Sequence, residues 1–156
     1  MGTVCYVGDD GQVRKGVAWP SPRFTDNSDG TVTDHVTGLV WLKNANCFGT
    51  QTWAASLASA NTLASGACSL TDNSVAGDWR LPNKVELKSL IDISQTSYPP
   101  LPTSHPFSGV VNSLYWTSTT YAKSTSYAWD VGFISGYVTH GLKTGTYGVW
   151  PVRGGP

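Results

Sequence analysis

The sequence predicts a single α+β domain, and three observations support this prediction. Two segments in the first two thirds of the chain show helical periodicity or helix-boundary residues. Every segment in the last third shows the residue types and alternation of β-strands. Between them lies the proline-rich stretch SYPPLPTSHPFSG, which excludes a helix or a central strand. Helices and antiparallel strands that are separated along the chain are typical of the α+β class.

The composition favours an exported protein. The 156 residues suit one domain with its own hydrophobic core. Charged residues make up 13% of the chain, about half of the usual quarter, whereas aromatic residues make up 12% and include 7 tryptophans. We therefore expect an extracytoplasmic domain on a cell surface or a phage, with a secretion signal that was removed or lies upstream of this sequence.

The charge balance argues against two classes of partner, nucleic acids and polyanionic glycans. Ten acidic residues offset ten basic residues, and the sequence contains no basic stripe that could displace counterions from a nucleic acid. The same balance argues against polyanionic glycans as ligands. No apolar run approaches the roughly 20 residues that cross a bilayer, so we expect no membrane insertion.

The N-terminal part is expected to be a connector followed by a short β-meander. Residues 1–22 are glycine-rich and end in two prolines, which favours an extended connector, and the domain is expected to cover residues 23–156. The Asp29-Gly30 pair is a tight-turn signal. The β-favouring residues at 31–33 and 39–42 predict two short strands around it.

Two helices are expected after the meander. In the segment TQTWAASLASANTLASG, Trp53, Leu57, Ala60 and Ala64 share one face at a period of 3.6, and Gly66 is expected to end the helix.

The second helix follows the sequence WRLP. Asn83 is its expected N-cap residue, and Glu86 stands three positions later, which is the spacing of a capping box. Leu87, Leu90 and Ile91 form its expected buried stripe.

The C-terminal segments LYWTSTTY, YAWDVGFI, GYVTHGL and YGVWPVRG predict an antiparallel sheet. Alternation within the second segment indicates a half-buried strand. It predicts that Asp130, Ile134, Tyr137 and Thr139 are more exposed than Trp129, Val131 and Phe133. Five tryptophans fall at inward positions of their elements and are expected in the core, namely Trp41, Trp53, Trp79, Trp116 and Trp129; Trp19 and Trp150, next to prolines, are not assigned.

The three cysteines leave more than one arrangement open. No CxxC pair is present, which argues against a zinc site. Cys47 and Cys68 bracket the first helix, and a disulfide between them would place their Cα atoms about 4.4–6.8 Å apart. Three reduced thiols are the alternative, and Cys5 is either free or paired with another molecule.

Catalytic and metal-binding patterns are scarce. The run from Asp26 to Asp34, DNSDGTVTD, spaces oxygen ligands much as a calcium loop does, but it lacks the closing glutamate and is better explained as a hairpin turn. The three histidines, at 35, 105 and 140, form no metal-binding pattern. Glu86 is the only glutamate and serves the helix start, and no GxSxG, Walker or GxGxxG motif occurs. We expect neither an enzyme nor a bound cofactor.

Several ordered blocks resemble a known family. They run from GVAWPSPRFTDNSDGTVTDHVTGLVWLKNA through WRLPNKVELKSLID and YWTSTTYA to AWDVGF and VWPVRGG, and they cover nearly the whole chain. The chain is similar to the C-terminal domain of the Legionella collagen-like adhesin. The resemblance implies a C-type lectin-like fold of the branch shared with formylglycine-generating enzymes, with two helices on antiparallel sheets and neighbouring termini.

The resemblance implies a ligand-binding domain with an unidentified protein or glycan partner. Calcium-dependent lectins of this fold use EPN or QPD followed by WND, and none of these triplets occurs here. Formylglycine-generating enzymes need a C-terminal cysteine pair, and no cysteine follows Cys68. A recognition domain is therefore the main expectation, an adhesin module with a fixed host glycan is the alternative, and an enzyme comes third.

The same fold includes the variable proteins of diversity-generating retroelements, in which outward residues vary on a fixed framework. The resemblance then implies an inward framework of Trp116, Ala128, Trp129, Val131, Phe133, Gly136, Val138, Lys143 and residues 150–155. The candidate ligand-binding and variable positions are Asp130, Gly132, Ile134, Ser135, Tyr137, Thr139, His140, Gly141, Leu142 and Tyr147. An ordinary solvent-facing surface would have the same mixed composition, so both interpretations stay open.

Overall fold

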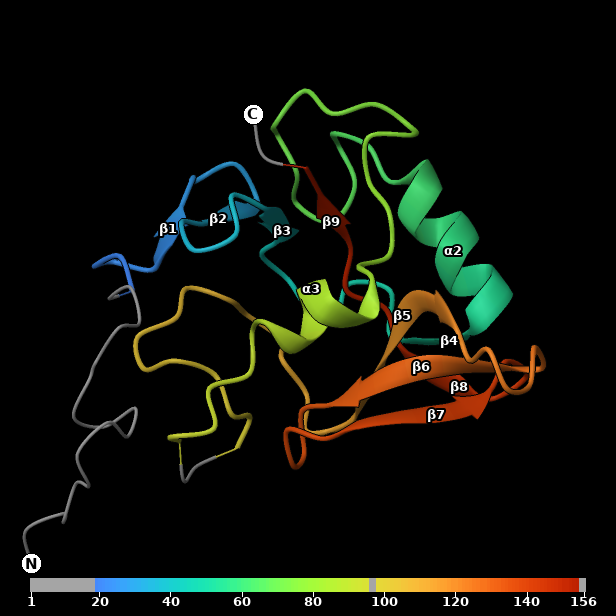
Figure 1. Ribbon diagram of the computed structural model, residues 1–156. Coiled ribbons are helices and arrows are strands. Elements are labelled where there is room, and N and C mark those ends of the chain that lie inside the picture. The colour runs from blue at the N-terminus through green and yellow to red at the C-terminus, as the bar shows by residue number, and fades with distance from the viewer. Residues whose placement is uncertain (1–18, 96–97, 155–156) are drawn as a thin grey trace, which may run out of the picture.

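The computed structural model describes residues 19–95 and 98–154 and shows two antiparallel-rich sheets with two helices (Figure 1). The four-stranded sheet has the order β1-β2-β3-β9, with β1 (Phe24–Asp26), β2 (Thr31–Asp34), β3 (Val40–Leu42) and β9 (Val152–Arg153). The five-stranded sheet has the order β4-β8-β5-β6-β7, with β4 (Thr50–Thr52), β8 (Thr146–Gly148), β5 (Leu114–Thr120), β6 (Tyr127–Gly132) and β7 (Val138–Leu142). The helices are α2 (Trp53–Thr62) and α3 (Lys84–Lys88). The predicted α+β class is confirmed. Cys5, Gly155 and most of the predicted connector lie outside the described residues.

The last two strands of the described chain contribute one strand to each sheet. Strand β8 lies between β4 and β5, and its only parallel pairing joins Gly148 to Tyr115. Strand β9 pairs with β3, with Trp41 opposite Val152. The first and last strands of the described chain therefore belong to the same sheet, and the last strands complete both sheets.

A hydrogen-bonded turn joins β1 to β2. The Asp29 carboxylate accepts hydrogen bonds from the backbone N–H of Thr31 at 3.0 Å and from its hydroxyl at 2.6 Å. Gly30 has a φ of +88°, and a Cβ there would lie 2.5 Å from the carbonyl oxygen of Ser69, so only glycine fits. Within the described ranges, no group of three metal-binding side chains occurs.

Helix α2 is shorter than the periodicity predicts. It ends at Thr62 because the next residue, Leu63, turns into an extended conformation and buries its side chain in the core. Gly66, the expected last residue, has a φ of +95° and instead belongs to the following turn. Packing of Leu63 overrides the alanine-rich helical propensity of the segment.

Helix α3 begins with the predicted capping box. The Asn83 side chain accepts hydrogen bonds from the N–H groups of Val85 and Glu86, both at 2.9 Å, and the Glu86 carboxylate accepts one from the Asn83 N–H at 2.7 Å. The pKa of Glu86 lies below its ordinary value, mainly because Arg80 donates hydrogen bonds to its carboxylate. The helix has only five residues, yet it places Leu87 in the core.

Removing the cap is expected to have a measurable but small cost. Asn83→Ala should lower the free energy of unfolding by about 1 kcal/mol, because two N–H groups lose their acceptor. Urea unfolding followed by tryptophan fluorescence measures this change. Asn46→Ala, at an exposed loop position, is the control, and an equal loss in both variants would contradict the capping role.

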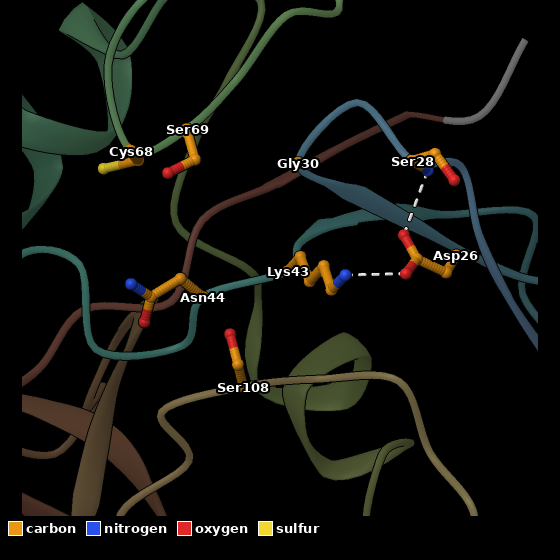
Figure 2. Close-up of a pocket in the computed structure, with 8 residues that line it drawn as sticks. All are labelled: Asp26, Ser28, Gly30, Lys43, Asn44, Cys68, Ser69 and Ser108. Carbon is orange, nitrogen blue, oxygen red and sulfur yellow. Dashed lines mark hydrogen bonds and ion pairs between the residues drawn. The ribbon is translucent and has the colours of Figure 1, made fainter.

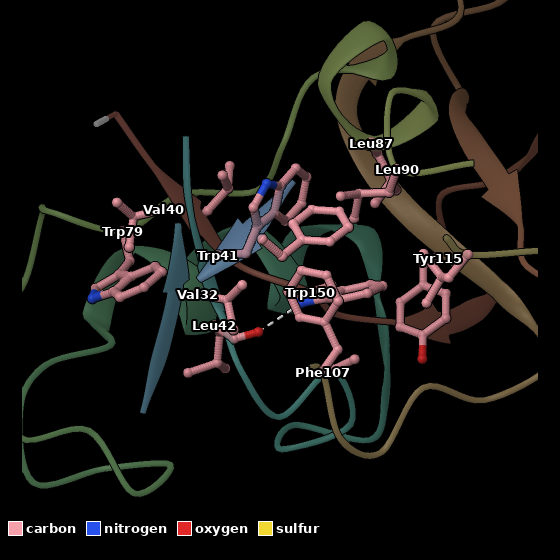
Figure 3. Packing of buried hydrophobic residues seen from close by; sticks show 14 of the residues in the cluster. Val32, Val40, Trp41, Leu42, Trp79, Leu87, Leu90, Phe107, Tyr115 and Trp150 are labelled. Carbon is pink, nitrogen blue, oxygen red and sulfur yellow. Dashed lines mark hydrogen bonds between the residues drawn. The ribbon is translucent and has the colours of Figure 1, made fainter. Parts of the chain in front are cut away.

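The core is built around Trp150 (Figure 3). Its ring contacts Trp41 with centroids 5.8 Å apart and Phe107 with centroids 5.0 Å apart, and its indole N–H donates to the carbonyl of Leu42 at 2.8 Å. Three of the five tryptophans assigned to the core, Trp41, Trp79 and Trp116, are fully buried. Trp53 is half-buried and packs against the smaller core cluster, whereas Trp129 is half-buried and belongs to neither cluster, so the assignment was wrong for Trp129.

Candidate ligand-binding face

The pairing of β6 with β7 determines on which face of the sheet the candidate residues of these two strands lie. Asp130 is opposite Thr139, and Trp129 is opposite His140. Directly paired residues share a face of the sheet, and adjacent residues along a strand point to opposite faces. The candidates at 139–142 therefore cannot form one surface.

The candidates divide among two faces and a turn. We call one side the Asp130 face; it carries Asp130, Gly132, Thr139 and Gly141, together with Tyr147 from β8. We call the other side the Trp129 face; it carries the candidates His140 and Leu142, with Trp129 and Val138 beside them. The turn between the strands holds Ile134, Ser135 and Tyr137.

The prediction that Asp130 is exposed was wrong. Asp130 is fully buried, as are Gly132 and Gly141, whereas Trp129 is partly accessible from the other side. Alternation indicates that a strand has two unlike faces, but here the face that carries Asp130 is the one covered by distant parts of the chain. Ile134, Tyr137 and Thr139 are exposed and Val131 and Phe133 are buried, as predicted.

The Asp130 carboxylate lacks hydrogen-bond partners. Neither of its oxygens has one within the described chain, and neither has the buried side-chain oxygen of Gln51. Trp116 is paired with Asp130 across the β5–β6 ladder, and its ring packs at a tilt against Tyr147 with centroids 4.3 Å apart. Burial raises the pKa of Asp130 to about 6, and burial together with the Asp130 charge raises the pKa of Tyr147.

The Trp129 face contains an apolar groove with a basic rim. Lys84, Val85 and Lys88 of α3 line it on one side, and Trp129 and Val138 line it on the other, around a volume of about 400 Å³. The Lys84 ammonium lies 4.1 Å from the centre of the Trp129 ring, in cation–π contact. The groove was not predicted, although Lys84 and Lys88 stand at the i, i+4 spacing of one helix face.

An aromatic cluster extends the Trp129 face. The His140 ring stacks on Tyr121 with centroids 4.1 Å apart and meets the edges of Tyr127 and Trp129. Neither Tyr121 nor Tyr127 was among the predicted site residues. The signal for Tyr127 was available, because Tyr127 stands two positions before Trp129 on the same strand face.

The turn from β6 to β7 is anchored by Gly136. Its φ is +74°, and a Cβ there would lie 3.1 Å from the Ile91 side chain, so the turn packs closely against the segment after α3. The Gly136 N–H donates to the Gly132 carbonyl at 2.7 Å. With its backbone fixed in this way, the turn presents Ile134 and Tyr137 to solvent.

A polar pocket of about 470 Å³ lies away from this turn (Figure 2). Its lining comes from four separate segments: Asp26, Ser28, Gly30, Lys43, Asn44, Cys68, Ser69 and Ser108. The Lys43 ammonium donates to the Asp26 carboxylate at 2.6 Å and lowers the pKa of Asp26. Because Asp26 is engaged by Lys43, the pocket gives no support to the calcium-loop alternative.

A disulfide fixes one wall of that pocket. Cys47 and Cys68 are bonded, and their Cα atoms lie 5.7 Å apart, inside the expected range. The bond ties the segment after α2 to the segment after β3, and both neighbouring residues Cys68 and Ser69 adopt positive φ values.

Comparison with protein families identifies the domain. Residues 30–153 match the family model of the Lcl C-terminal domain. The chain belongs to the Lcl C-terminal domain family. This match agrees with the resemblance to the Legionella collagen-like adhesin, and it indicates an adhesin-type surface domain. A search among curated proteins found no match. No helix in the described part of the Lcl domain is both long and apolar enough to cross a membrane.

Proposed function

We propose that this Lcl domain is a non-enzymatic, extracytoplasmic recognition domain with a C-type lectin-like fold. Its binding face is the β6–β7 turn together with the Trp129 face of β7, where His140 and Leu142 are exposed. The observation that supports this is the concentration of accessible side chains there: Tyr137 is 73% exposed, Ile134 54% and Leu142 49%. Tyrosine supplies a large contact area with little loss of rotamer freedom, and apolar residues of this kind are common anchors in interfaces.

Three structural features support the lectin-like part of the proposal. Two helices accompany two sheets that are rich in antiparallel pairs, the first and last strands share a sheet, and the strands of the C-terminal half carry the exposed face. An enzyme of the formylglycine-generating type is disfavoured because it needs a cysteine pair, and no cysteine follows Cys68.

The turn is the part of the face to test first. The double variant Ile134→Ser/Tyr137→Ala should weaken adhesion of the purified domain to its target surface by about tenfold or more, because both exposed anchors are removed. Adhesion to immobilised host cells, a glycan array and a protein pull-down measure binding to the separate ligand classes. Val75→Ser, at a comparably exposed position in another loop, is the control. Unchanged adhesion of the double variant would contradict the assignment of the turn.

Diversification by a retroelement is a second, narrower proposal. Six of the ten candidate positions are exposed and fall between residues 134 and 142, as a variable surface requires. A Cβ at Gly141 would lie within 2.8 Å of three atoms of the Tyr147 side chain, so variation should avoid Gly141 as long as Tyr147 is retained. The test is a search of neighbouring DNA, beside a reverse transcriptase gene, for a near-copy of the segment encoding residues 116–154 that differs only at adenines. Without such a copy, the adhesin with a fixed glycan ligand stands as the alternative.

A further inference from the structure

The outer edge of the five-stranded sheet has unused backbone hydrogen-bonding groups. Strand β7 lies at the end of the order β4-β8-β5-β6-β7 and pairs only with β6. The Gly132 N–H donates to the Tyr137 carbonyl at 2.8 Å, and the Lys143 N–H donates to the Ser126 carbonyl at 2.9 Å. Hydrogen-bonded pairs alternate along an antiparallel ladder, so the backbone groups of Val138, His140 and Leu142 point away from β6.

Most of these outward groups have no partner in the described chain. Only the Leu142 carbonyl is engaged, by the N–H of Gly145 at 2.8 Å. The N–H and carbonyl groups of Val138 and His140, and the N–H of Leu142, make no hydrogen bond with any described residue. An edge of this length is a template for another strand.

The edge also lacks the residues that normally prevent strand addition. Natural edge strands are protected by lysine, proline, bulges or extreme shortness. The five residues of β7, Val-Thr-His-Gly-Leu, include no proline and no Lys, Arg, Asp or Glu, and their pairing with β6 has no register shift. The other edge of this sheet, β4, is only three residues long and leads directly into α2.

The groove on the Trp129 face lies beside this edge. Val138 belongs to both, and His140 and Leu142 point to the same side. Lys84 and Lys88 line the groove without forming an ion pair with any described residue, and the lining includes no carboxylate. A strand added next to β7 would therefore place alternate side chains over an apolar floor with a basic rim.

We propose that β7 binds an extended, acidic peptide segment of a protein partner, which adds a sixth strand to the sheet. Its backbone pairs with Val138, His140 and the Leu142 N–H, and its acidic side chains face Lys84 and Lys88 in the groove. The inference rests on the proposed recognition function and specifies the partner as a peptide.

Peptide binding to the full chain tests the inference. The probe is a library of acetylated, amidated seven-residue peptides with Asp or Glu at alternate positions and Val or Tyr between them. Fluorescence anisotropy should detect binding below about 1 mM, and N-methylation of alternate peptide bonds should weaken it by about tenfold or more. His140→Pro removes one outward N–H without taking a donor from the β6 ladder, and it should cause a comparable loss.

A charge-reversal pair keeps the test informative if His140→Pro fails to fold. The double variant Lys84→Glu/Lys88→Glu should weaken the binding of acidic peptides by about tenfold and strengthen the binding of basic ones. Lys123 is an exposed lysine outside the groove, so Lys123→Glu should leave the binding of both unchanged. Absence of peptide binding, or insensitivity to N-methylation, would overturn the inference. If adhesion persists and still depends on Ile134 and Tyr137, the recognition function stands without it. Binding of a glycan in the groove would also overturn the inference, because the glycan would then be the occupant. A dimer that His140→Pro abolishes would overturn it as well, because a second copy of the chain would then occupy the edge.

Discussion

Asp130→Asn is expected to stabilise the protein by up to about 3 kcal/mol at pH 7. The buried carboxylate has a pKa of about 6 in the folded protein and near 3.8 in the unfolded chain. Between these values the folded state binds more protons than the unfolded state, so the free energy of unfolding falls as the pH rises from about 4 to about 6. A rise of the pKa from 3.8 to about 6 corresponds to about 3 kcal/mol, and asparagine carries no charge to desolvate.

Urea unfolding of the wild type and the variant, from about pH 4 to about pH 7.5, measures this effect. The difference between the two proteins should grow with pH up to about 6 and then stay constant. The variant is compared with the wild type at each pH because His105 also titrates in both proteins. Burial lowers the pKa of His105, which makes the free energy of unfolding rise with pH in an overlapping range. Asp78→Asn, at an exposed position, is the control. A difference that is independent of pH would contradict an unpaired, buried Asp130 carboxylate.

Asp34→Ala is expected to cost about 3–5 kcal/mol, because it leaves a buried guanidinium without its counter-charge. The Arg23 Nε and Nη2 groups donate to the two Asp34 oxygens at 3.1 and 3.0 Å, and both side chains are almost inaccessible to solvent. The same carboxylate accepts hydrogen bonds from the Val36 N–H and the Thr37 hydroxyl. Arg23 also donates to the Ser89 carbonyl at 2.7 Å, so the pair joins the first sheet to the segment that follows α3.

The exposed ion pair between Lys43 and Asp26 is the matched control for this prediction. Its side chains are about one third accessible, and Lys43→Ala should cost no more than about 1 kcal/mol. The double variant Arg23→Leu/Asp34→Leu should recover much of the stability lost in Asp34→Ala, because it removes both buried charges. Thermal and urea unfolding measure all three variants. Similar losses in Asp34→Ala and Lys43→Ala would show that burial of the Arg23–Asp34 pair has no special cost.

Local signals predicted the elements that depend on neighbouring residues. The capping box at Asn83 and Glu86 was recognisable because both partners lie within one turn of helix. The turn at Asp29-Gly30 and the C-terminal strands were equally local. The shorter α2 was not predictable, because Leu63 leaves the helix to reach core partners that are distant in sequence.

The orientation of the candidate site depended on contacts that no local pattern encodes. Alternation along β6 separates Asp130 from Trp129, but it does not identify which side is exposed to water. Asp130 is covered from β5 and β8, by Trp116 and Tyr147, whereas Trp129 faces α3. The same limit applies to Trp150, which the sequence leaves unassigned because it stands next to Pro151, and which nevertheless lies at the centre of the core. The turn residues Ile134 and Tyr137 were predictable as exposed because a turn has no second sheet face to cover it.

The position of β8 also determines when the five-stranded sheet can be completed. The pairings β1–β2, β2–β3, β5–β6 and β6–β7 join consecutive strands, so these hairpins depend only on neighbouring segments. Strand β8 joins β4 to β5, and β9 pairs with β3, so the last connections of both sheets need residues 146–153. These pairings join distant segments, which favours slow completion of the two sheets after the local hairpins have formed.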